Sequence, residues 1–349
     1  MKRDEGGAYR DVRAVVLGAS GFIGRWVAHA LGARGARLSL VVRDATAAAS
    51  VFSRYGTIAP GNRGDVYECD LRESGSLQAL FEAIRPAVTF NLAGYGVDRA
   101  ERDAETTYLL NAGLLDQLGE AIAGRQDGAW PGQHLVHVGS ALEYGSSGGN
   151  LDETSQPHAT TLYGKSKLAG TLAVARGCSA RGIRGLTARL FTVYGPGEHA
   201  GRLLPSLVEA ARSGEALRLT AGEQKRDFTY IGDVAEGLLR LGLAQVAPGA
   251  IINLATGRLT RVRDFVETAA GILRIPGDRL QFGALPTRAE EMEHAQVTIE
   301  RLRRSVAWVP PTDIADGIRR TLRFNREHGK GEIRPTQSGG KEADEEQDR

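Results

Sequence analysis

The chain has 349 residues, of which 42% are hydrophobic and 25% are charged, and its formal net charge is +2. This length allows a large hydrophobic core and a smaller second lobe. The balanced charge argues against a nucleic-acid partner, because proteins that bind nucleic acid concentrate Lys and Arg. Cys69 and Cys178 belong to no Cys/His cluster. This excludes a disulfide framework and a zinc site, and it favours the reducing cytoplasm.

The sequence predicts neither an N-terminal signal peptide nor a membrane span. Residues 1–13 are charged and lack the apolar core of a signal peptide. No stretch approaches the roughly 18 apolar residues that a membrane span requires. Residues 329–349 are polar and contain no aromatic side chain. They cannot bury enough surface to offset their ordering entropy, so they are predicted to form a disordered tail.

Short apolar runs alternate with helical patterns along most of the chain. This alternation predicts an α/β fold, a Rossmann-type doubly wound parallel sheet with a smaller, mostly C-terminal lobe for the substrate. The predicted dinucleotide-binding domain is 11–195, with 228–255 returning to it. The predicted substrate lobe is 196–227 and 256–325, with a helix at about 262–274. Strands are predicted at 13–17, 38–42, 66–71, 88–94, 134–140, 185–191 and 251–255.

A glycine-rich turn, Gly18, Gly21 and Gly24, follows the first strand and opens the first helix. Glycines at such a turn permit a tight bend, a close approach of the backbone to a pyrophosphate, and close packing of helix on sheet. The helix N-terminus then offers free N–H groups and partial positive charge to the phosphates. The spacing is G-x-x-G-x-x-G rather than the commoner G-x-G-x-x-G. It predicts a dinucleotide site, with a turn that binds no ligand as the alternative.

The end of the second predicted strand bears on the type of cofactor. An acid at this place accepts hydrogen bonds from the adenosine ribose of NAD, whereas an arginine pairs with the 2′-phosphate of NADP. The sequence here is Val42-Arg43-Asp44. Arg43 favours NADP (as NADPH) over NAD. In the alternative, Arg43 faces solvent and Asp44 contacts the ribose.

Tyr163 and Lys167 are four residues apart, on one face of a predicted helix. A phenol with its usual pKa near 10 is a poor proton shuttle at neutral pH. An ammonium about 4 Å away contributes about 4 kcal/mol at an effective dielectric near 20, enough to bring that pKa to about 7. Ser140 ends a predicted strand and is able to hydrogen-bond the same substrate oxygen. Together with the glycine turn, these three residues predict hydride transfer between a nicotinamide and a carbinol or carbonyl carbon.

These motifs resemble the extended short-chain dehydrogenase/reductase family, in particular its nucleotide-sugar epimerase, dehydratase and reductase branch. The resemblance covers about residues 12–325. It implies that Ser140, Tyr163 and Lys167 are catalytic and that Asn111 orders a water of a proton relay. It also implies a cofactor site along Gly18, Ser20, Gly21, Phe22, Ile23, Gly24, Arg43, Asp70, Leu71, Leu92, Ala93, Gly94, Tyr163, Lys167, Leu190 and Val193.

The C-terminal half carries the likeness to sugar-nucleotide enzymes, in the segments 201–207, 225–238, 287–293 and 306–322. Arg226 matches the residue that binds the diphosphate. Arg288 and Glu291 match a pair that contacts phosphate and ribose. The substrate residues implied by the resemblance are Leu142, Glu143, Thr192, Arg202, Leu203, Arg226, Arg288 and Glu291.

Departures from the family patterns indicate the reaction. The family's dehydratases and decarboxylases carry a Glu two residues after the catalytic Ser or Thr. Here that position is Leu142, and Glu143 follows one residue later, which turns its side chain to the other face. Thr192 stands where epimerases and dehydratases commonly have Asn. The sequence therefore predicts NADPH-dependent reduction of the C4 ketone of a nucleoside-diphosphate 4-keto-6-deoxy sugar.

Three alternatives stay open. One is a 4-epimerase that retains NAD, and another is a dehydratase or decarboxylase that uses Glu143. The third is a non-catalytic relative that senses nucleotides or associates with RNA, although such relatives often lack the tyrosine or the lysine. The resemblance also implies a homodimer formed through the helices at about 105–123 and 162–181.

Overall fold

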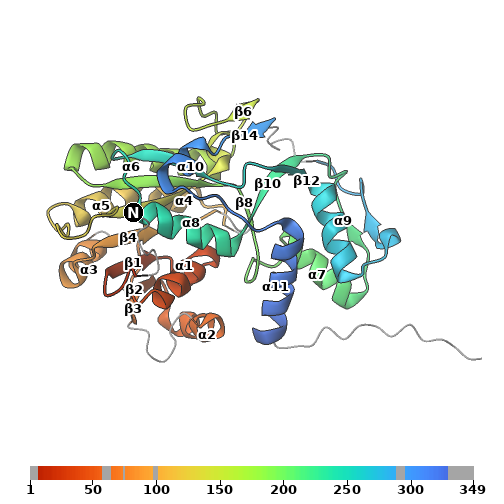
Figure 1. The fold of residues 1–349 in the computed structure, drawn as a ribbon, viewed down its shortest axis with the longest axis horizontal. Coiled ribbons are helices and arrows are strands. Elements are labelled where there is room, and N and C mark those ends of the chain that lie inside the picture. The colour runs from red at the N-terminus through yellow and green to blue at the C-terminus, as the bar shows by residue number, and fades with distance from the viewer. Residues whose placement is uncertain (1–6, 57–63, 74, 97–100, 288–294, 329–349) are drawn as a thin grey trace, which may run out of the picture.

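The computed structural model describes residues 7–56, 64–73, 75–96, 101–287 and 295–328. Its centre is a seven-stranded parallel sheet with the order β11-β7-β5-β4-β1-β2-β3, which confirms the predicted doubly wound fold (Figure 1). The strands are β1 (Arg13–Leu17), β2 (Arg37–Val42), β3 (Gly64–Glu68), β4 (Val88–Asn91), β5 (Leu135–Ser140), β7 (Gly185–Leu190) and β11 (Ala250–Leu254).

Helices cover both faces of this sheet, because successive strand residues point to opposite sides. In β1, Val15 and Leu17 pack toward α3, α5 and α6, whereas Ala14 and Val16 pack toward α1 and α8. A π-helical turn, Leu109–Gly113, separates α4 from α5. The helices around the sheet are α1 (Phe22–Ala33), α2 (Ala45–Tyr55), α3 (Ser76–Ile84), α4 (Ala104–Tyr108), α5 (Leu114–Ile122), α6 (Leu162–Arg181), α8 (Ile231–Leu243) and α10 (Glu300–Val306).

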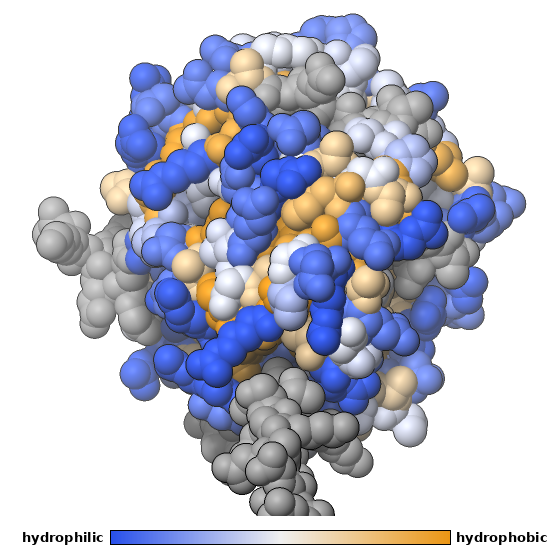
Figure 2. All heavy atoms as spheres, turned by 90° about the vertical axis from the view of Figure 1, so that its right-hand side faces the viewer, coloured by the Kyte–Doolittle hydropathy of each residue, from blue (hydrophilic) through white to orange (hydrophobic). Residues whose placement is uncertain are grey.

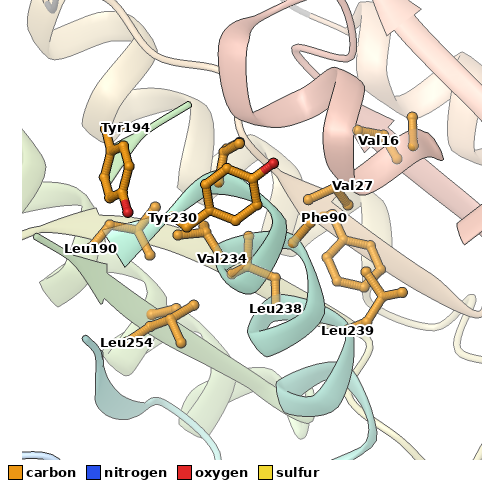
Figure 3. Close-up of a cluster of buried hydrophobic side chains, with 14 of the residues drawn as sticks. Val16, Val27, Phe90, Leu190, Tyr194, Tyr230, Val234, Leu238, Leu239 and Leu254 are labelled. Carbon is orange, nitrogen blue, oxygen red and sulfur yellow. The ribbon is translucent and has the colours of Figure 1, made fainter. Parts of the chain in front are cut away.

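The largest core lies between the sheet and α8. Val234, Leu238 and Leu239 of α8 are at most 1% exposed. They belong to one buried cluster with Phe90 of β4 and Leu254 of β11 (Figure 3). Apolar burial of this kind is the dominant stabilising contribution to a fold. It anchors α8, which leads the chain back from the small lobe to the edge of the sheet.

The smaller lobe lies at the right of Figure 1. Its sheet has the order β12-β10-β8, with β10 parallel to β8 and antiparallel to β12. Figure 2 views the molecule from this side and shows mainly hydrophilic residues, with hydrophobic ones in strips between them. The elements are β8 (Thr192–Tyr194), α7 (Leu203–Ser213), β9 (Leu217–Arg218), β10 (Lys225–Tyr230), β12 (Leu259–Arg261), α9 (Val262–Leu273), β13 (Leu280–Gln281) and α11 (Ile314–His328).

The strand β10 pairs with the lobe strands as far as Tyr230, and α8 follows from Ile231 against the main sheet; the predicted domain bounds stay a prediction. A short parallel pair, β6 (Asn150–Leu151) with β14 (Gln296–Val297), joins the loop after β5 to the C-terminal part. The predicted tail, 329–349, lies outside the described residues.

Asp227 of β10 links the lobe to the loop after β11. Its side chain is buried and accepts hydrogen bonds from the backbone N–H groups of Thr256, Gly257 and Arg258, at 2.7–3.1 Å. The hydroxyls of Thr256 and Thr229 also donate to it. A buried carboxylate is stable only with such compensation, and this one holds the lobe sheet against the edge of the main sheet.

Candidate active site

The glycine turn forms a cradle for a dinucleotide. Gly18 has a φ of +72°, and a Cβ there would lie 2.8 Å from the backbone nitrogen of Ala93. A Cβ on Gly24 would collide with the carbonyl oxygen of Gly18. Gly21 precedes α1 and has no side chain with which to cap it, so the first N–H groups of the helix can bind a phosphate. These residues fit the pyrophosphate of a nicotinamide dinucleotide.

The remaining predicted cofactor residues lie at the same edge of the sheet. Parallel strands place their carboxyl ends together, where ligands bind in open α/β sheets. Leu190 ends β7 and is paired in register with Ser140. Ser20, Phe22, Ile23, Leu71, Leu92, Ala93 and Val193 are half-buried, and Gly94 is exposed.

At the adenosine end of the predicted site, Arg43 and Asp44 have different environments. Asp44 caps α2, because its Oδ1 accepts a hydrogen bond of 2.8 Å from the backbone N–H of Ala47. Arg43 is exposed. Asp70 accepts hydrogen bonds from the Arg72 guanidinium, which, with a smaller contribution from the Arg43 charge, lower its pKa to about 2. The Asp44 carboxylate is thus already engaged, whereas the Arg43 guanidinium faces solvent.

The helix α6 carries Tyr163 and Lys167 to the end of β5. Thr161 caps it by accepting a hydrogen bond of 3.0 Å from the Gly164 N–H. A Cβ on Gly164 would collide with the carbonyl oxygen of Leu142, so the glycine lets α6 approach the turn after Ser140. Lys167 is 3% exposed, and Tyr163 is half-buried. The structure therefore brings the predicted Ser140, Tyr163 and Lys167 to one place.

The pKa of Tyr163 shifts in the direction opposite to the one predicted. Burial raises it well above its usual value, and the negative charge of Glu143 raises it further. Burial lowers the pKa of Lys167 to about 8, although the Glu143 charge opposes this shift. Withdrawal of the phenol from water and the charge of Glu143 outweigh the opposing charge of Arg202. The phenol is protonated at neutral pH.

Glu143 forms a buried ion pair beneath the site. Its Oε2 accepts a hydrogen bond of 2.8 Å from Nε of Arg189, and its Oε1 accepts one of 2.8 Å from the backbone N–H of Ser140. Glu143 is fully buried and Arg189 is 2% exposed, with the Arg189 guanidinium 4.5 Å from the centre of the Tyr144 ring. Both oxygens of Glu143 are thus engaged within the protein. Leu142, by contrast, is half-buried beside α6.

Asn111 ties the loop after β4 to α6. It is fully buried in the π-helical turn, a kind of irregularity that is frequent at functional sites. Its Oδ1 accepts a hydrogen bond from the Tyr95 N–H, and its Nδ2 donates to the Tyr95 carbonyl and to Oγ of Ser166. The Ser166 hydroxyl in turn donates to the carbonyl of Tyr163. The side chain thereby supports the start of α6, and its role in ordering a water stays a prediction.

The lobe supplies the predicted substrate residues. Arg202 lies just before α7, 3.8 Å from the carboxylate of Glu198, and its positive charge reaches Tyr163. Burial raises the pKa of Glu198 to about 7. Thr192 of β8 pairs with Phe228 of β10. Leu203 opens α7 and Arg226 lies in β10, both half-buried. Arg288 and Glu291 lie outside the described residues.

The comparisons with known proteins agree with this geometry. A model of the NAD dependent epimerase/dehydratase family matches residues 14–255. The chain is 31% identical to dTDP-6-deoxy-L-talose 4-dehydrogenase (NAD(P)(+)) of Kitasatospora kifunensis, over 88% of this chain and 93% of that protein.

The chain belongs to the NAD dependent epimerase/dehydratase family. This confirms the resemblance to extended short-chain dehydrogenases/reductases, enzymes that use NAD or NADP. Another family member, GDP-6-deoxy-D-mannose reductase of Pseudomonas aeruginosa, is 28% identical over 89% of this chain and 96% of that protein.

Solved structures of the family share the fold. An epimerase from Methanothermobacter thermautotrophicus superposes with a TM-score of 0.78 at 23% identity, over 93% of this chain and 95% of that one. A UDP-glucuronic acid 4-epimerase from Bacillus cereus in complex with NAD superposes with a TM-score of 0.75 at 21% identity, over 91% and 98%. Among the described helices, none combines the length and the apolar character needed to cross a bilayer.

The ion pair beneath the site makes a prediction for stability. Glu143→Gln leaves the Arg189 charge buried without its partner, and we expect the free energy of unfolding in urea to fall by about 3–5 kcal/mol. The double variant Glu143→Leu with Arg189→Met leaves no buried charge and should lose less than half of that. If the double variant is less stable than Glu143→Gln, uncompensated charge is not the cause.

Proposed function

We propose that this enzyme reduces the C4 ketone of a nucleoside-diphosphate 4-keto-6-deoxy sugar with NADPH. The observation that carries the proposal is the position of Glu143, whose two carboxylate oxygens are engaged beneath Ser140. Dehydration requires an acid or base that reaches the carbon next to the ketone. Leu142 beside the catalytic helix has no such group. This arrangement supports a reaction confined to hydride and proton transfer.

The relatives support the same substrate class. The Kitasatospora kifunensis protein is named as a 4-dehydrogenase of a dTDP-6-deoxy sugar, and the Pseudomonas aeruginosa protein as a reductase of a GDP-6-deoxy sugar. Both names describe redox chemistry on a 6-deoxy sugar linked to a nucleoside diphosphate. We assign the same class to this chain.

Tyr163, Ser140 and Lys167 each have a separate role in the proposed reaction. The bound nicotinamide supplies the hydride to the ketone carbon. Tyr163 donates its phenolic proton to the oxygen, a task that suits a phenol kept protonated by burial and by the Glu143 charge. Ser140 donates a hydrogen bond to the same oxygen and orients it. The Lys167 ammonium holds the ribose next to the nicotinamide and stabilises the phenolate that Tyr163 leaves behind.

The lobe recognises the nucleotide part of the substrate. Arg226 is placed in the strand next to β8 and binds the diphosphate, since guanidinium groups bind phosphate through paired hydrogen bonds. Arg202 adds positive charge near Tyr163. Leu142, Thr192 and Leu203 contact the sugar. Arg288 and Glu291 are proposed at the phosphate and the ribose on the strength of the sequence motif.

The cofactor preference rests on the end of β2. Arg43 faces solvent and binds the 2′-phosphate of NADPH, whereas the Asp44 carboxylate already caps α2. A net reductase must exchange its oxidised cofactor for a reduced one in each turnover. The 2′-phosphate, which NADH lacks, is a charged group that Arg43 can bind, so the enzyme can select NADPH over NADH.

A 4-epimerase is the second candidate. The chain is 25% identical, over 90% of its length, to the Arabidopsis thaliana protein named UDP-glucuronate 4-epimerase 3. An epimerase oxidises and reduces the same carbon, so Ser140, Tyr163 and Lys167 would serve both halves of the reaction. Such an enzyme should retain NAD on purification and interconvert sugar epimers without added cofactor, whereas the proposed reductase should consume NADPH in stoichiometric amount.

We also propose that the enzyme is a cytoplasmic homodimer that packs through α4, α5 and α6. Tyr108 of α4 and Leu172 of α6 are 42% and 44% exposed, which is unusual for large apolar side chains unless a partner covers them. A sedimentation measurement that gives the mass of one chain would exclude the dimer.

The activity is tested with purified protein, NADPH and dTDP- or GDP-4-keto-6-deoxy sugars, by following the loss of nicotinamide absorbance. We expect oxidation of NADPH and one 4-hydroxy product. Tyr163→Phe should lower kcat by about 10²–10⁴-fold, because it removes the proton donor and little else. Tyr67→Phe, at a half-buried tyrosine of the edge strand β3, is the matched control and should change kcat by less than twofold. Absence of oxidation with every sugar would reject the reductase.

The cofactor preference is tested by Arg43→Ala. We expect the KM for NADPH to rise by about 10–100-fold, because one charge-assisted contact to the 2′-phosphate is lost. The KM for NADH should stay within twofold. Arg54→Ala, which removes another arginine, from the last turn of α2, controls for a general loss of positive charge. Equal effects of Arg43→Ala on both cofactors would show that Arg43 does not contact the 2′-phosphate.

A further inference from the structure

A strip of buried polar side chains lies behind Lys167, between the sheet and α6. Asn91 of β4, His137 of β5 and Thr187 of β7 are neighbours in register on adjacent strands. Thr171 lies one turn after Lys167 on α6. All four side chains are fully buried. We call Asn91, His137, Thr171 and Thr187 the polar strip.

The polar strip has unsatisfied hydrogen-bonding groups. Nδ2 of Asn91 lies 3.2 Å from Nδ1 of His137. The amide N–H is a donor, so Nδ1 accepts, and a neutral imidazole then carries its proton on Nε2. Among the described residues, no protein group pairs with Nε2 of His137, Oδ1 of Asn91, or the hydroxyls of Thr171 and Thr187. Buried polar atoms are seldom left unpaired, and internal water commonly satisfies them.

The charges around the polar strip keep His137 neutral. Burial lowers its pKa far below the usual value, and the Lys167 ammonium lowers it further. Glu143, which follows β5, and Arg189 of β7 form the neighbouring ion pair. Tyr163 and Lys165 are the other titratable groups on this part of α6; Lys165 is exposed, and the charges of Glu101 and Arg202 act on Tyr163. A neutral imidazole among these charges offers one donor, Nε2–H, throughout the working pH range.

We propose that His137 is a positioning residue that acts on Lys167 through an internal water held by the polar strip. One water can accept hydrogen bonds from His137 Nε2–H and from an N–H of Lys167, and donate to the hydroxyls of Thr171 and Thr187. Three of the four unpaired groups, Nε2 of His137 and the two threonine hydroxyls, then find a partner of the right kind. The water solvates the ammonium from behind while its front face holds the ribose. This inference rests on the proposed role of Lys167 at the cofactor.

The tautomer is tested on the full-length protein without cofactor. Nitrogen-15 NMR of the imidazole groups should show His137 neutral, with its proton on Nε2, from pH 5.5 to 9. The His137→Gln spectrum assigns the signals by difference among the 7 histidines. A proton on Nδ1, or titration of His137 within this range, would overturn the proposed hydrogen-bond pattern.

The effect on Lys167 is tested by NADPH binding, measured by fluorescence against pH without any sugar. The pKa of Lys167 is lowered to about 8. The ammonium is lost as the pH rises through this value, so affinity should fall there. His137→Leu removes one of the groups that hold the water. Without that water, the ammonium of Lys167 is poorly solvated. The midpoint of the fall should then move at least half a pH unit lower.

Two further variants separate this role from a structural one. His137→Gln keeps an N–H donor and should return the midpoint toward that of the native protein. Thr89→Val removes the unpaired hydroxyl of another fully buried residue of β4, two positions before Asn91, and should leave the midpoint unchanged. An unchanged midpoint in His137→Leu would overturn the inference, and so would an equal shift in His137→Leu and His137→Gln. A protein that shows the shift yet reduces no keto sugar would contradict only the proposed function.

Discussion

The buried ion pair between Glu143 and Arg189 is the interaction on which the site depends. It fixes the backbone of Ser140 through one carboxylate oxygen and holds Arg189 of the neighbouring strand through the other. Gly139 makes it possible, since a Cβ there would lie 2.5 Å from Oε1 of Glu143. Taking two charges out of water is costly, and such a pair rarely contributes to stability by itself. Its contribution is geometric, because it determines how the end of β5 faces α6.

The same ion pair influences the protonation states of Tyr163 and Lys167 on α6. Burial alone favours the neutral forms of both Tyr163 and Lys167. The Glu143 charge raises the pKa of both groups, so it strengthens the shift of the phenol and opposes that of the amine. The result at neutral pH is a protonated phenol beside an ammonium. That pair can give a proton to a forming alkoxide and stabilise the phenolate that results, as reduction requires. An uncharged residue at position 143 would leave the phenol easier to ionise and the amine harder to keep charged.

Local patterns were sufficient to predict much of the fold. Residues 13–17 form a strand with the predicted bounds, and the helix predicted at about 262–274 spans Val262–Leu273, because apolar runs and helical spacing are properties of neighbouring residues. The glycine turn and the Tyr163–Lys167 spacing are local in the same sense. The partnership of Glu143 with Arg189 joins residues 46 positions apart and depends on strand register. The sequence feature that could have indicated this ion pair is Arg189, a charged residue within the apolar strand 185–190. The small sheet of the lobe was also missed, because its strands are short and far apart in sequence.

The polar strip shows where the sheet departs from the rule that forms it. A parallel strand buried on both faces is expected to be apolar throughout. On the face toward α6, β1 follows this rule with Val15 and Leu17, whereas the partners of these residues on β4 are Thr89 and Asn91. Polar side chains continue at His137 of β5 and Thr187 of β7, as far as the ion pair between Glu143 and Arg189. Folded proteins violate such local rules mainly at functional sites. The polar face extends below Lys167, so the sheet itself lines the buried side of this residue with polar groups.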